Sequence, residues 1–398
     1  MTFILYWFVI IPVGVMRRLF GIKDLDFTWG DGSPSYWHQK QKKTHKKVTS
    51  INDQLDLNAR YGVCPQMADY DQISKKQEFL PYLMSFCQPN CEFNSVSTNR
   101  LGFRTTLDCD GIPVDPEKLH SLVSPSSIVI GGSTVFGIGA TNDLHTIPNI
   151  LNRITDSLWF NFGGRAFNST QEMLLFALHL PRRLDRIVVF SGVNNLVLSF
   201  FNNGASPIYG PFFSQSVFES VIKSPSIENI GLRPAAKQFI KELLHFATKK
   251  KDQLEDPPLP LLTSDFDDDY QNILTCFRRD LYVCKLLAEG SGSQFYFALQ
   301  PFATWVEKTF SPEEKNIFAM LDNIQSGNWQ VVLNNLSTLR DQYFDDIARI
   351  CAEEDVPYYN LNLDSAFCCE EWLFIDRVHL TDRGHALAAE IIKREFNL

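Results

Sequence analysis

The stretch Ser127-Ile128-Val129-Ile130-Gly131-Gly132-Ser133 decides the fold of this chain. Its apolar part is predicted to be a buried strand. The two glycines then allow the backbone to turn sharply, which places the Ser133 hydroxyl at the carboxyl end of that strand. In open α/β sheets, ligands bind at this edge. Ser133 is therefore the first candidate functional residue.

Beyond this stretch, strand-like and helix-like segments alternate along the chain. Such alternation is typical of a parallel sheet with helices on both faces. We predict strands at 127–131, 158–162, 186–191, 294–299 and 357–361, and helices at about 146–156, 169–180, 270–289 and 381–396. The predicted fold class is α/β, a doubly wound three-layer sandwich around a parallel sheet.

A distant motif, Asp376-Arg377-Val378-His379, supplies a base for Ser133. A serine hydroxyl is a weak nucleophile unless a base lies within hydrogen-bond distance and a third group orients that base. On a tight turn, the Asp376 carboxylate can bind one imidazole nitrogen of His379 and leave the other facing the serine. His385 follows Asp382 at the same spacing, but both are predicted to lie inside the last helix, which favours His379 as the base.

Together these motifs resemble the SGNH or GDSL hydrolases, a family whose four sequence blocks, numbered one, two, three and five, lie in one flavodoxin-like α/β domain. Block one is Gly131-Gly132-Ser133, with Gly132 where the family often carries Asp, and block five is the motif with Asp376 and His379. Block two follows the predicted strand at 158–162, and block three follows the strand at 186–191. The resemblance spans roughly residues 125 to 398.

Blocks two and three imply an oxyanion hole. In Gly192-Val193-Asn194-Asn195, the Asn194 side-chain amide would be one donor, and a backbone N–H of Asn161-Phe162-Gly163-Gly164-Arg165-Ala166 would be another. Counted from Asn161, the glycine of the family falls on Ala166, so Gly163, Gly164 and Ala166 remain alternative donors. Arg165 and Asn195 are the candidate substrate-binding residues. Arg165 would either reach an anionic substrate or pair with a surface carboxylate.

The resemblance implies a serine esterase acting on O-acyl bonds, with Ser133 as nucleophile, His379 as general base and Asp376 as its partner. An O-acyltransferase uses the same residues and differs in passing the acyl group to another hydroxyl instead of water. A third interpretation is a catalytically silent interaction protein on the same fold, favoured by the departures at Gly132 and Ala166. No cofactor is implied and no metal is expected, because the Cys87, Cys91 and Cys368-Cys369 positions lack a second ligand pair.

The glycine-rich turn is also similar to a phosphate-binding loop. Gly132 and Gly137 have the required spacing, but Ile138 and Gly139 occupy the positions of the Lys and the Ser or Thr. A G-x-S-x-G turn is excluded as well, because Val135 replaces its last glycine. These departures exclude a nucleotide-binding loop and an α/β-hydrolase elbow.

Composition narrows the class of partner. The chain has 398 residues, of which 44% are hydrophobic, and a net charge of −9. This charge argues against nucleic-acid binding, which needs a basic surface. Nine cysteines, an odd number at irregular spacing, indicate a reducing compartment for the catalytic domain rather than a secreted disulfide framework.

Residues 1–50 differ from the rest of the chain. The uncharged stretch Phe3 to Met16 is shorter than the ~20 residues of a spanning helix, and no basic residue precedes it as in a signal peptide. Lysines and arginines follow it, which favours a membrane-surface contact with the catalytic domain on the cytoplasmic side. Such placement suits an enzyme of surface glycans or lipid-linked substrates. The alternative is an apolar helix packed on a cytoplasmic protein.

Three parts are predicted along the chain. Residues 1–50 form the membrane-associating segment and basic linker, residues 51–125 an N-terminal extension, and residues 126–398 the catalytic domain with a helical insertion at about 200–292. The insertion is rich in phenylalanine, and these side chains form either an apolar lid over the site or part of the core. They are Phe200, Phe201, Phe212, Phe213, Phe218, Phe239 and Phe246.

Overall fold

The computed structural model describes residues 59–120, 126–180, 183–202, 204–213, 215, 264–324 and 327–398. The chain divides into two compact units, Met1–Leu55 and Asp56–Leu398, and the second holds every described residue. The predictions for residues 1–50 and for Phe218, Phe239 and Phe246 lie outside the described residues.

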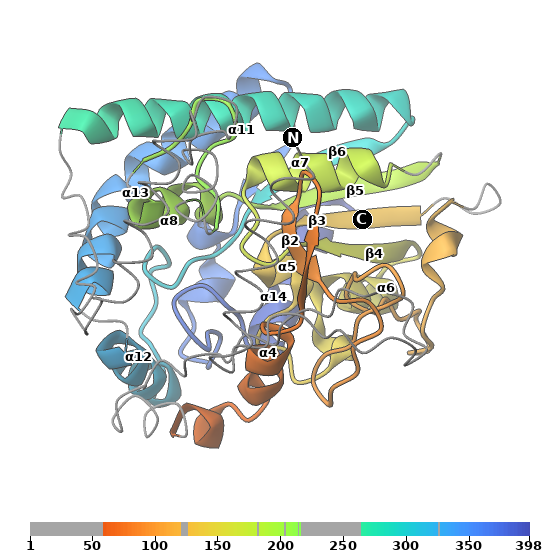
Figure 1. The fold of residues 1–398 in the computed structure, drawn as a ribbon, viewed down its shortest axis with the longest axis horizontal. Coiled ribbons are helices and arrows are strands. Elements are labelled where there is room, and N and C mark those ends of the chain that lie inside the picture. Colours follow the sequence, from red (N-terminus) through yellow and green to blue (C-terminus); the bar gives the residue numbers. More distant parts are fainter. Residues whose placement is uncertain are drawn as a thin grey trace, which may run out of the picture. The chain divides into compact units, whose positions relative to one another are not determined.

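A five-stranded parallel sheet forms the centre of the second unit (Figure 1). Its strands are β3 (Ser126–Gly131), β4 (Leu158–Gly163), β5 (Leu184–Ser191), β6 (Gln294–Leu299) and β7 (Tyr358–Asn360). Their order is β4-β3-β5-β6-β7, and every neighbouring pair is parallel. Counted along the chain, this is the 2-1-3-4-5 order of flavodoxin-like sheets. The predicted doubly wound α/β fold is confirmed.

Helices cover both faces of the sheet (Figure 1). One face carries α7 (Ser169–Leu178), α8 (Val193–Asn202), α11 (Ser264–Gly290) and α13 (Gly327–Glu353), and the other carries α6 (Ile147–Ile154) and α14 (Asp382–Phe396). The remaining described elements are α4 (Met67–Ile73), α5 (Ser133–Phe136), α12 (Pro312–Ile324), the hairpin strands β1 (Gln77–Leu80) and β2 (Met84–Cys87), and the 3-10 turns η2 (Pro116–His120), η3 (Asp143–His145), η5 (Leu361–Leu363) and η6 (Ser365–Cys368). Among the described residues, none of these helices combines the length and apolarity needed to cross a membrane.

Alternate residues of each strand serve the two faces. Ile128 and Ile130 of β3 pack in the cluster that contains α7 and α11, whereas Val129 between them packs in the cluster of α6 and α14. Strand β5 divides its side chains in the same way. Because both faces are buried, the strands are mostly apolar, which is the pattern that made them recognisable in the sequence.

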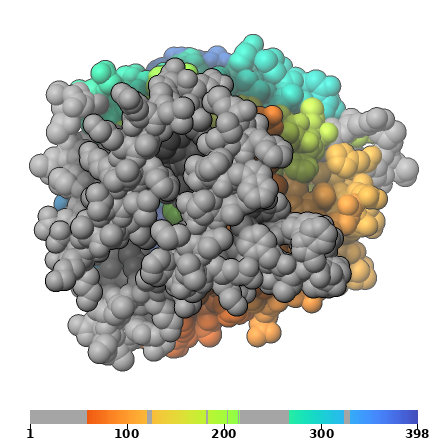
Figure 2. Space-filling model, viewed as in Figure 1, coloured from red at the N-terminus to blue at the C-terminus, as the bar shows by residue number. Residues whose placement is uncertain are grey.

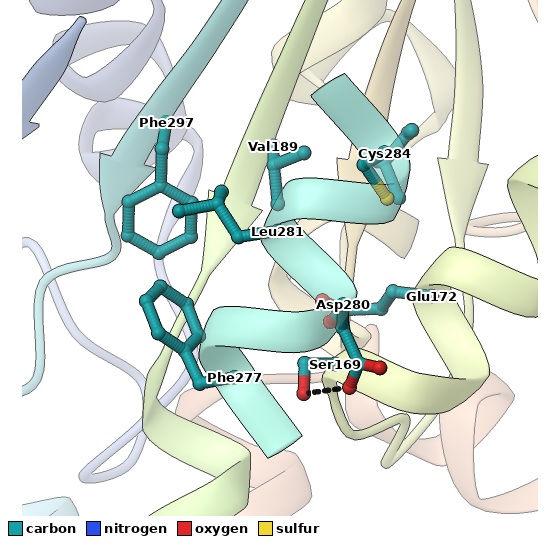
Figure 3. Close-up of a pocket in the computed structure, with 9 residues that line it drawn as sticks. Ser169, Glu172, Val189, Phe277, Asp280, Leu281, Cys284 and Phe297 are labelled. Carbon is teal, nitrogen blue, oxygen red and sulfur yellow. Dashed lines mark hydrogen bonds between the residues drawn. The ribbon is translucent and has the colours of Figure 1, made fainter. Parts of the chain in front are cut away.

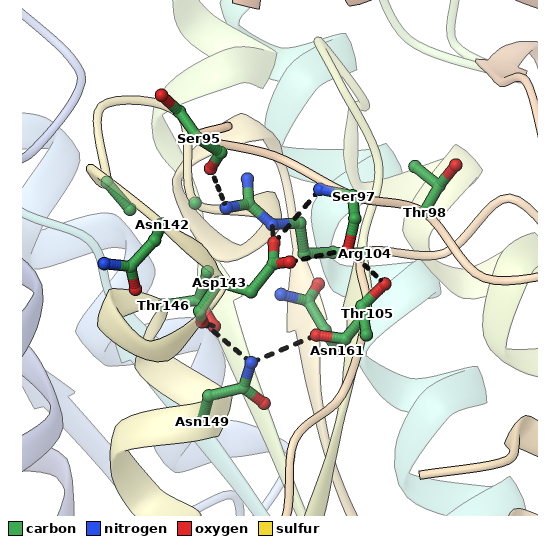
Figure 4. Close-up of polar contacts among 12 residues, drawn as sticks. Ser95, Ser97, Thr98, Arg104, Thr105, Asn142, Asp143, Thr146, Asn149 and Asn161 are labelled. Atoms are coloured by element: carbon green, nitrogen blue, oxygen red, sulfur yellow. Dashed lines mark hydrogen bonds and ion pairs between the residues drawn. The ribbon is translucent and has the colours of Figure 1, made fainter. Parts of the chain in front are cut away.

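The N-terminal extension packs into this core. It also makes polar contacts with the segment around Asp143 (Figure 4). Arg104 is fully buried, and its Nε donates to Asp143 Oδ1 at 2.5 Å. Its two other nitrogens donate to the Tyr70 hydroxyl at 2.9 Å and the Ser95 carbonyl at 2.7 Å. Tyr70 in turn donates to the Gly137 carbonyl at 2.7 Å, directly behind α5. The extension therefore supports the turn that carries Ser133.

The described part of the insertion is mostly core. Phe200 is buried and stacks on Phe266 of α11, with ring centroids 5.0 Å apart, and Phe212 is also buried. Phe201 and Phe213 are half exposed, at 50% and 58%. In Figure 2, α11 reaches the surface along the top of the view, beside the orange and yellow residues of the first half of the chain. The core interpretation thus holds for Phe200 and Phe212.

Candidate active site

Ser133 is the first residue of α5, and only Gly132 separates it from the end of β3. It is mostly buried, with 8% of its surface exposed. The first N–H groups of a helix have no acceptor within the helix, so the Ser133 N–H is available to a ligand. The strand–turn–helix geometry expected from the two glycines is present.

His379 joins Ser133 to Asp376. Its Nε2 lies 2.8 Å from Ser133 Oγ, and its Nδ1 lies 2.7 Å from Asp376 Oδ2. The other carboxylate oxygen, Oδ1, accepts the backbone N–H groups of Val378 at 2.8 Å and of His379 at 2.7 Å. The carboxylate is thereby fixed against the imidazole, as the Asp-x-x-His spacing predicted.

The charge of Asp376 is stabilised locally. Burial raises the pKa of Asp376, but the nearby His379 charge and the hydrogen bonds from His379 and Val378 outweigh it and hold the pKa well below its usual range. Asp376 therefore stays ionised at neutral pH and far below. An ionised partner is what stabilises a positively charged imidazole when it takes a proton.

His385, the alternative base, lies elsewhere. It is fully buried, its Nε2 lies 3.4 Å from the Ile138 carbonyl oxygen, and burial lowers its pKa to about 3. Asp382 does not contact it but accepts the Thr141 N–H at 2.8 Å and the Thr141 hydroxyl at 2.5 Å. The structure brings His379, and not His385, to Ser133.

Asn194 lies beside the nucleophile turn. Its Nδ2 donates to the Phe167 carbonyl at 2.8 Å, which uses one of its two amide hydrogens. A Cβ on Gly132 would come within 2.7 Å of the same nitrogen. Glycine at position 132 thus leaves room for the Asn194 amide.

Block two differs from the expectation at Gly163 and Gly164. The Gly163 N–H donates to Asn161 Oδ1 at 2.9 Å, and the Gly164 N–H donates to the Gly131 carbonyl at 2.9 Å. Both groups are occupied, which corrects their assignment as oxyanion donors. Ala166 has a left-handed φ of 56°, and its N–H has no acceptor within the described part of the chain. Ala166 therefore remains as the candidate donor from this block.

The two candidate substrate-binding residues have other contacts. Asn195 is 2% exposed, accepts the Ser169 N–H at 2.8 Å and donates to the Ser169 hydroxyl at 2.8 Å. These contacts correct its assignment, since both ends of the amide are used inside the protein. Arg165 donates from Nη2 to Ser74 Oγ, and burial lowers its pKa while the adjacent Cys87 thiol opposes this shift. The structure records no contact of Arg165 with Ser133, Asp376 or His379 within the described residues.

A buried acidic pair beneath block three was not anticipated (Figure 3). Glu172 of α7 accepts a hydrogen bond from Ser191 at 2.7 Å, and Asp280 of α11 accepts one from Ser169 at 2.7 Å. Both acids line a cavity of about 20 Å³, which is large enough for one water molecule. Burial raises the pKa of Glu172 to about 8. Glu172 lies in the first turn of α7, a position where an acid is favoured by the helix dipole. Its place in the sequence therefore did not predict that its side chain is buried.

Known proteins offer distant likenesses only. No protein-family model and no curated protein matches the chain. Solved structures that match include an acetyl xylan esterase, AlAXEase, with 11% identity and a TM-score of 0.35 over 68% of this chain and 98% of that one. An extracellular lipase from Streptomyces rimosus has 8% identity and a TM-score of 0.35, covering 68% of this chain and 100% of that one.

A third structure bears the name of the family that the sequence blocks resemble. It is a candidate lipolytic protein of the G-D-S-L family from Desulfitobacterium hafniense, with 12% identity and a TM-score of 0.34, covering 68% of this chain and 99% of that one. At such scores the likeness supports no inference about the chemistry of this chain. The function is therefore inferred from the geometry of Ser133, His379 and Asp376.

Proposed function

We propose that this chain is a serine esterase that hydrolyses O-acyl bonds. The observation that carries the proposal is the position of His379, with Nε2 2.8 Å from Ser133 Oγ and Nδ1 2.7 Å from Asp376 Oδ2. A general base within hydrogen-bond distance of a hydroxyl, itself oriented by a carboxylate, is the arrangement that activates serine for attack on a carbonyl.

The reaction proceeds in two halves. Ser133 Oγ attacks the ester carbonyl while His379 takes its proton, and the same imidazole then donates that proton to the leaving alcohol. In the second half, water attacks the acyl carbonyl while His379 takes its proton, and the imidazolium returns that proton to Ser133 Oγ as the carboxylic acid leaves. In both halves the ionised Asp376 stabilises the imidazolium.

Three donors support the proposed oxyanion hole. They are the Ser133 N–H at the start of α5, the second hydrogen of the Asn194 amide and the N–H of Ala166. Donors fixed in place before the reaction stabilise the negative charge that develops on the carbonyl oxygen. The left-handed backbone of Ala166 is held by the fold, since alanine has no intrinsic preference for it.

The first prediction concerns Ser133→Ala. Loss of the hydroxyl should abolish turnover of p-nitrophenyl acetate and labelling by a fluorophosphonate probe, because both need the activated oxygen. The melting temperature should stay nearly unchanged, since the change removes one oxygen atom from a mostly buried side chain and takes no apolar atom out of the core. Both reactions and thermal unfolding should be measured on the purified protein.

Each outcome of this experiment is informative. Retained turnover in Ser133→Ala would show that the nucleophile is a different residue. A wild-type protein that neither reacts with the probe nor cleaves the ester would favour the catalytically silent interpretation. If added sugar alcohols receive the acyl group in preference to water, the same residues perform O-acyl transfer.

A further inference from the structure

The loop that carries Asp376 and His379 is closed by backbone hydrogen bonds of its own. The Ile375 N–H donates to the His379 carbonyl at 3.0 Å, and the Thr381 N–H donates to the Leu373 carbonyl at 2.9 Å. These bonds close the loop, and the N–H of Ala303, in the segment after β6, donates to the Arg377 carbonyl at 2.9 Å. Its position relative to Ser133 therefore depends on neighbouring elements.

Helix α12 provides one such contact through Glu314. Ser311 precedes the helix, and its N–H donates to Glu314 Oε2 at 2.8 Å while the Glu314 N–H donates to the Ser311 hydroxyl at 3.2 Å, forming a capping box. The other oxygen, Oε1, accepts the N–H groups of Leu373 at 3.0 Å and Phe374 at 3.1 Å. One carboxylate thus joins the helix start to the beginning of the loop.

Lys308 completes this contact. Its Nζ lies 2.7 and 2.6 Å from the two Glu314 oxygens and 2.8 Å from the Glu371 carbonyl. Both side chains of the pair are 0% exposed. A buried ion pair is costly to desolvate and persists only with good geometry and satisfied hydrogen bonds, which makes its position well defined.

The same face of α12 holds the other end of the loop. Phe318 and Asp322 follow Glu314 at intervals of four residues and therefore lie along one side of the helix. The guanidinium of Arg377 lies 4.3 Å from the Phe318 ring centroid, and its Nη2 donates to Asp322 Oδ2 at 2.9 Å. Arg377 is the residue next to Asp376. Helix α12 therefore contacts the chain immediately beside the triad formed by Ser133, His379 and Asp376.

We propose that this face of α12, with Glu314 and Lys308 as its centre, positions the Asp376–His379 loop against Ser133. The inference rests on the proposed function but concerns residues outside the triad. A base must be held within about 0.5 Å of its productive position, and a displacement of about 1 Å can reduce a rate by about a hundredfold. Glu314 touches no reacting atom, so it is a positioning residue.

The test compares Glu314→Gln with Glu313→Gln, the same change at an exposed neighbour on the same helix. Glu314→Gln should lower kcat for p-nitrophenyl acetate by a factor of roughly 10 to 100 with little change in KM. It should also broaden or abolish the downfield proton NMR resonance of the His379 Nδ1–H that is bonded to Asp376. Glu313→Gln should change neither.

A second variant addresses the case in which Glu314→Gln does not fold. Asp322→Asn removes a partly exposed ion pair with Arg377 and leaves Lys308 and Glu314 intact. It should lower kcat by a factor of about 3 to 10 and weaken the same resonance, at an unchanged melting temperature. A lower melting temperature with normal kcat in every folded variant would show that α12 is merely structural.

The resonance separates this proposal from the esterase proposal. If the wild-type protein shows the resonance but no turnover, the esterase proposal fails, and loss of the signal in Glu314→Gln or Asp322→Asn still supports positioning. If the folded variants keep the resonance and the turnover of Glu313→Gln, the positioning proposal is overturned.

Discussion

At the scale of single residues, the neighbouring Asn194 and Asn195 have different surroundings. Asn194 makes one hydrogen bond, from its amide nitrogen to the Phe167 carbonyl, whereas Asn195 binds Ser169 through both its carbonyl oxygen and its amide nitrogen. Asn194→Ala should therefore lower kcat by roughly 10² to 10³, about 2.7 to 4 kcal/mol, with little change in KM. Steady-state kinetics with a soluble ester measures this effect.

Asn195→Ala provides the control for that prediction. It removes two buried hydrogen bonds and should lower the melting temperature more than Asn194→Ala does. If Asn195→Ala shows the larger loss of kcat at a temperature where both variants are folded, Asn194 is not the oxyanion donor.

At the scale of elements, the junction of α7 and β5 makes stability depend on pH. Burial raises the pKa of Glu172 from 4.5 to about 8, so the folded protein keeps a proton that the unfolded chain releases near pH 4.5. The resulting stabilisation is complete below pH 4.5 and is lost as the pH rises toward 8. Over this interval, the folding free energy changes by at most about 1.4 kcal/mol per pH unit from this group.

Glu172→Gln should remove this dependence, because glutamine is neutral at every pH and can still accept the Ser191 hydrogen bond. Thermal unfolding between pH 5 and 9 should show a smaller fall in melting temperature for Glu172→Gln than for the wild-type protein. Glu78→Gln on the exposed strand β1 is the control and should follow the wild-type curve. Parallel curves for all three proteins would contradict a protonated Glu172.

The sequence predicted the elements whose signals are local. The strands of the sheet are mostly apolar, and the start of α14 was recognisable from Thr381, whose hydroxyl accepts the Gly384 N–H at 3.1 Å. Helix α12 was not predicted, although Ser311-Pro312-Glu313-Glu314 combines a capping box with proline at the first helical position. That signature could have located the helix, but not the loop it contacts.

The residues of the candidate site also fall into two groups, those predictable from local sequence signals and those that depend on tertiary contacts. Ser133, Asp376 and His379 were predictable because a glycine turn and a three-residue spacing determine their local geometry. The occupied N–H groups of Gly163 and Gly164 were not, because their acceptors are the Asn161 side chain and a neighbouring strand. Spacing within a motif shows which groups are present, while competition for hydrogen bonds depends on the tertiary structure.

At the scale of the whole molecule, the N-terminal extension should be required for folding. Arg104→Met removes a fully buried guanidinium and leaves Asp143 without its ion pair, which should destabilise the protein by about 3 to 5 kcal/mol. Arg100→Met removes an exposed pair with Glu117 and should cost about 1 kcal/mol or less. Urea unfolding of both variants measures the difference, and equal midpoints would show that the extension is a dispensable appendage.

The distance between Ser133 and His379 along the chain has a consequence for biosynthesis. The two residues are 246 positions apart, and the base lies only after the last strand of the sheet. At about 5 to 20 residues per second, a ribosome needs roughly 12 to 50 s to pass from the serine to the histidine. Throughout that interval the nascent chain carries a Ser133 hydroxyl without its proposed base, so the proposed esterase activity cannot arise before His379 has been synthesised.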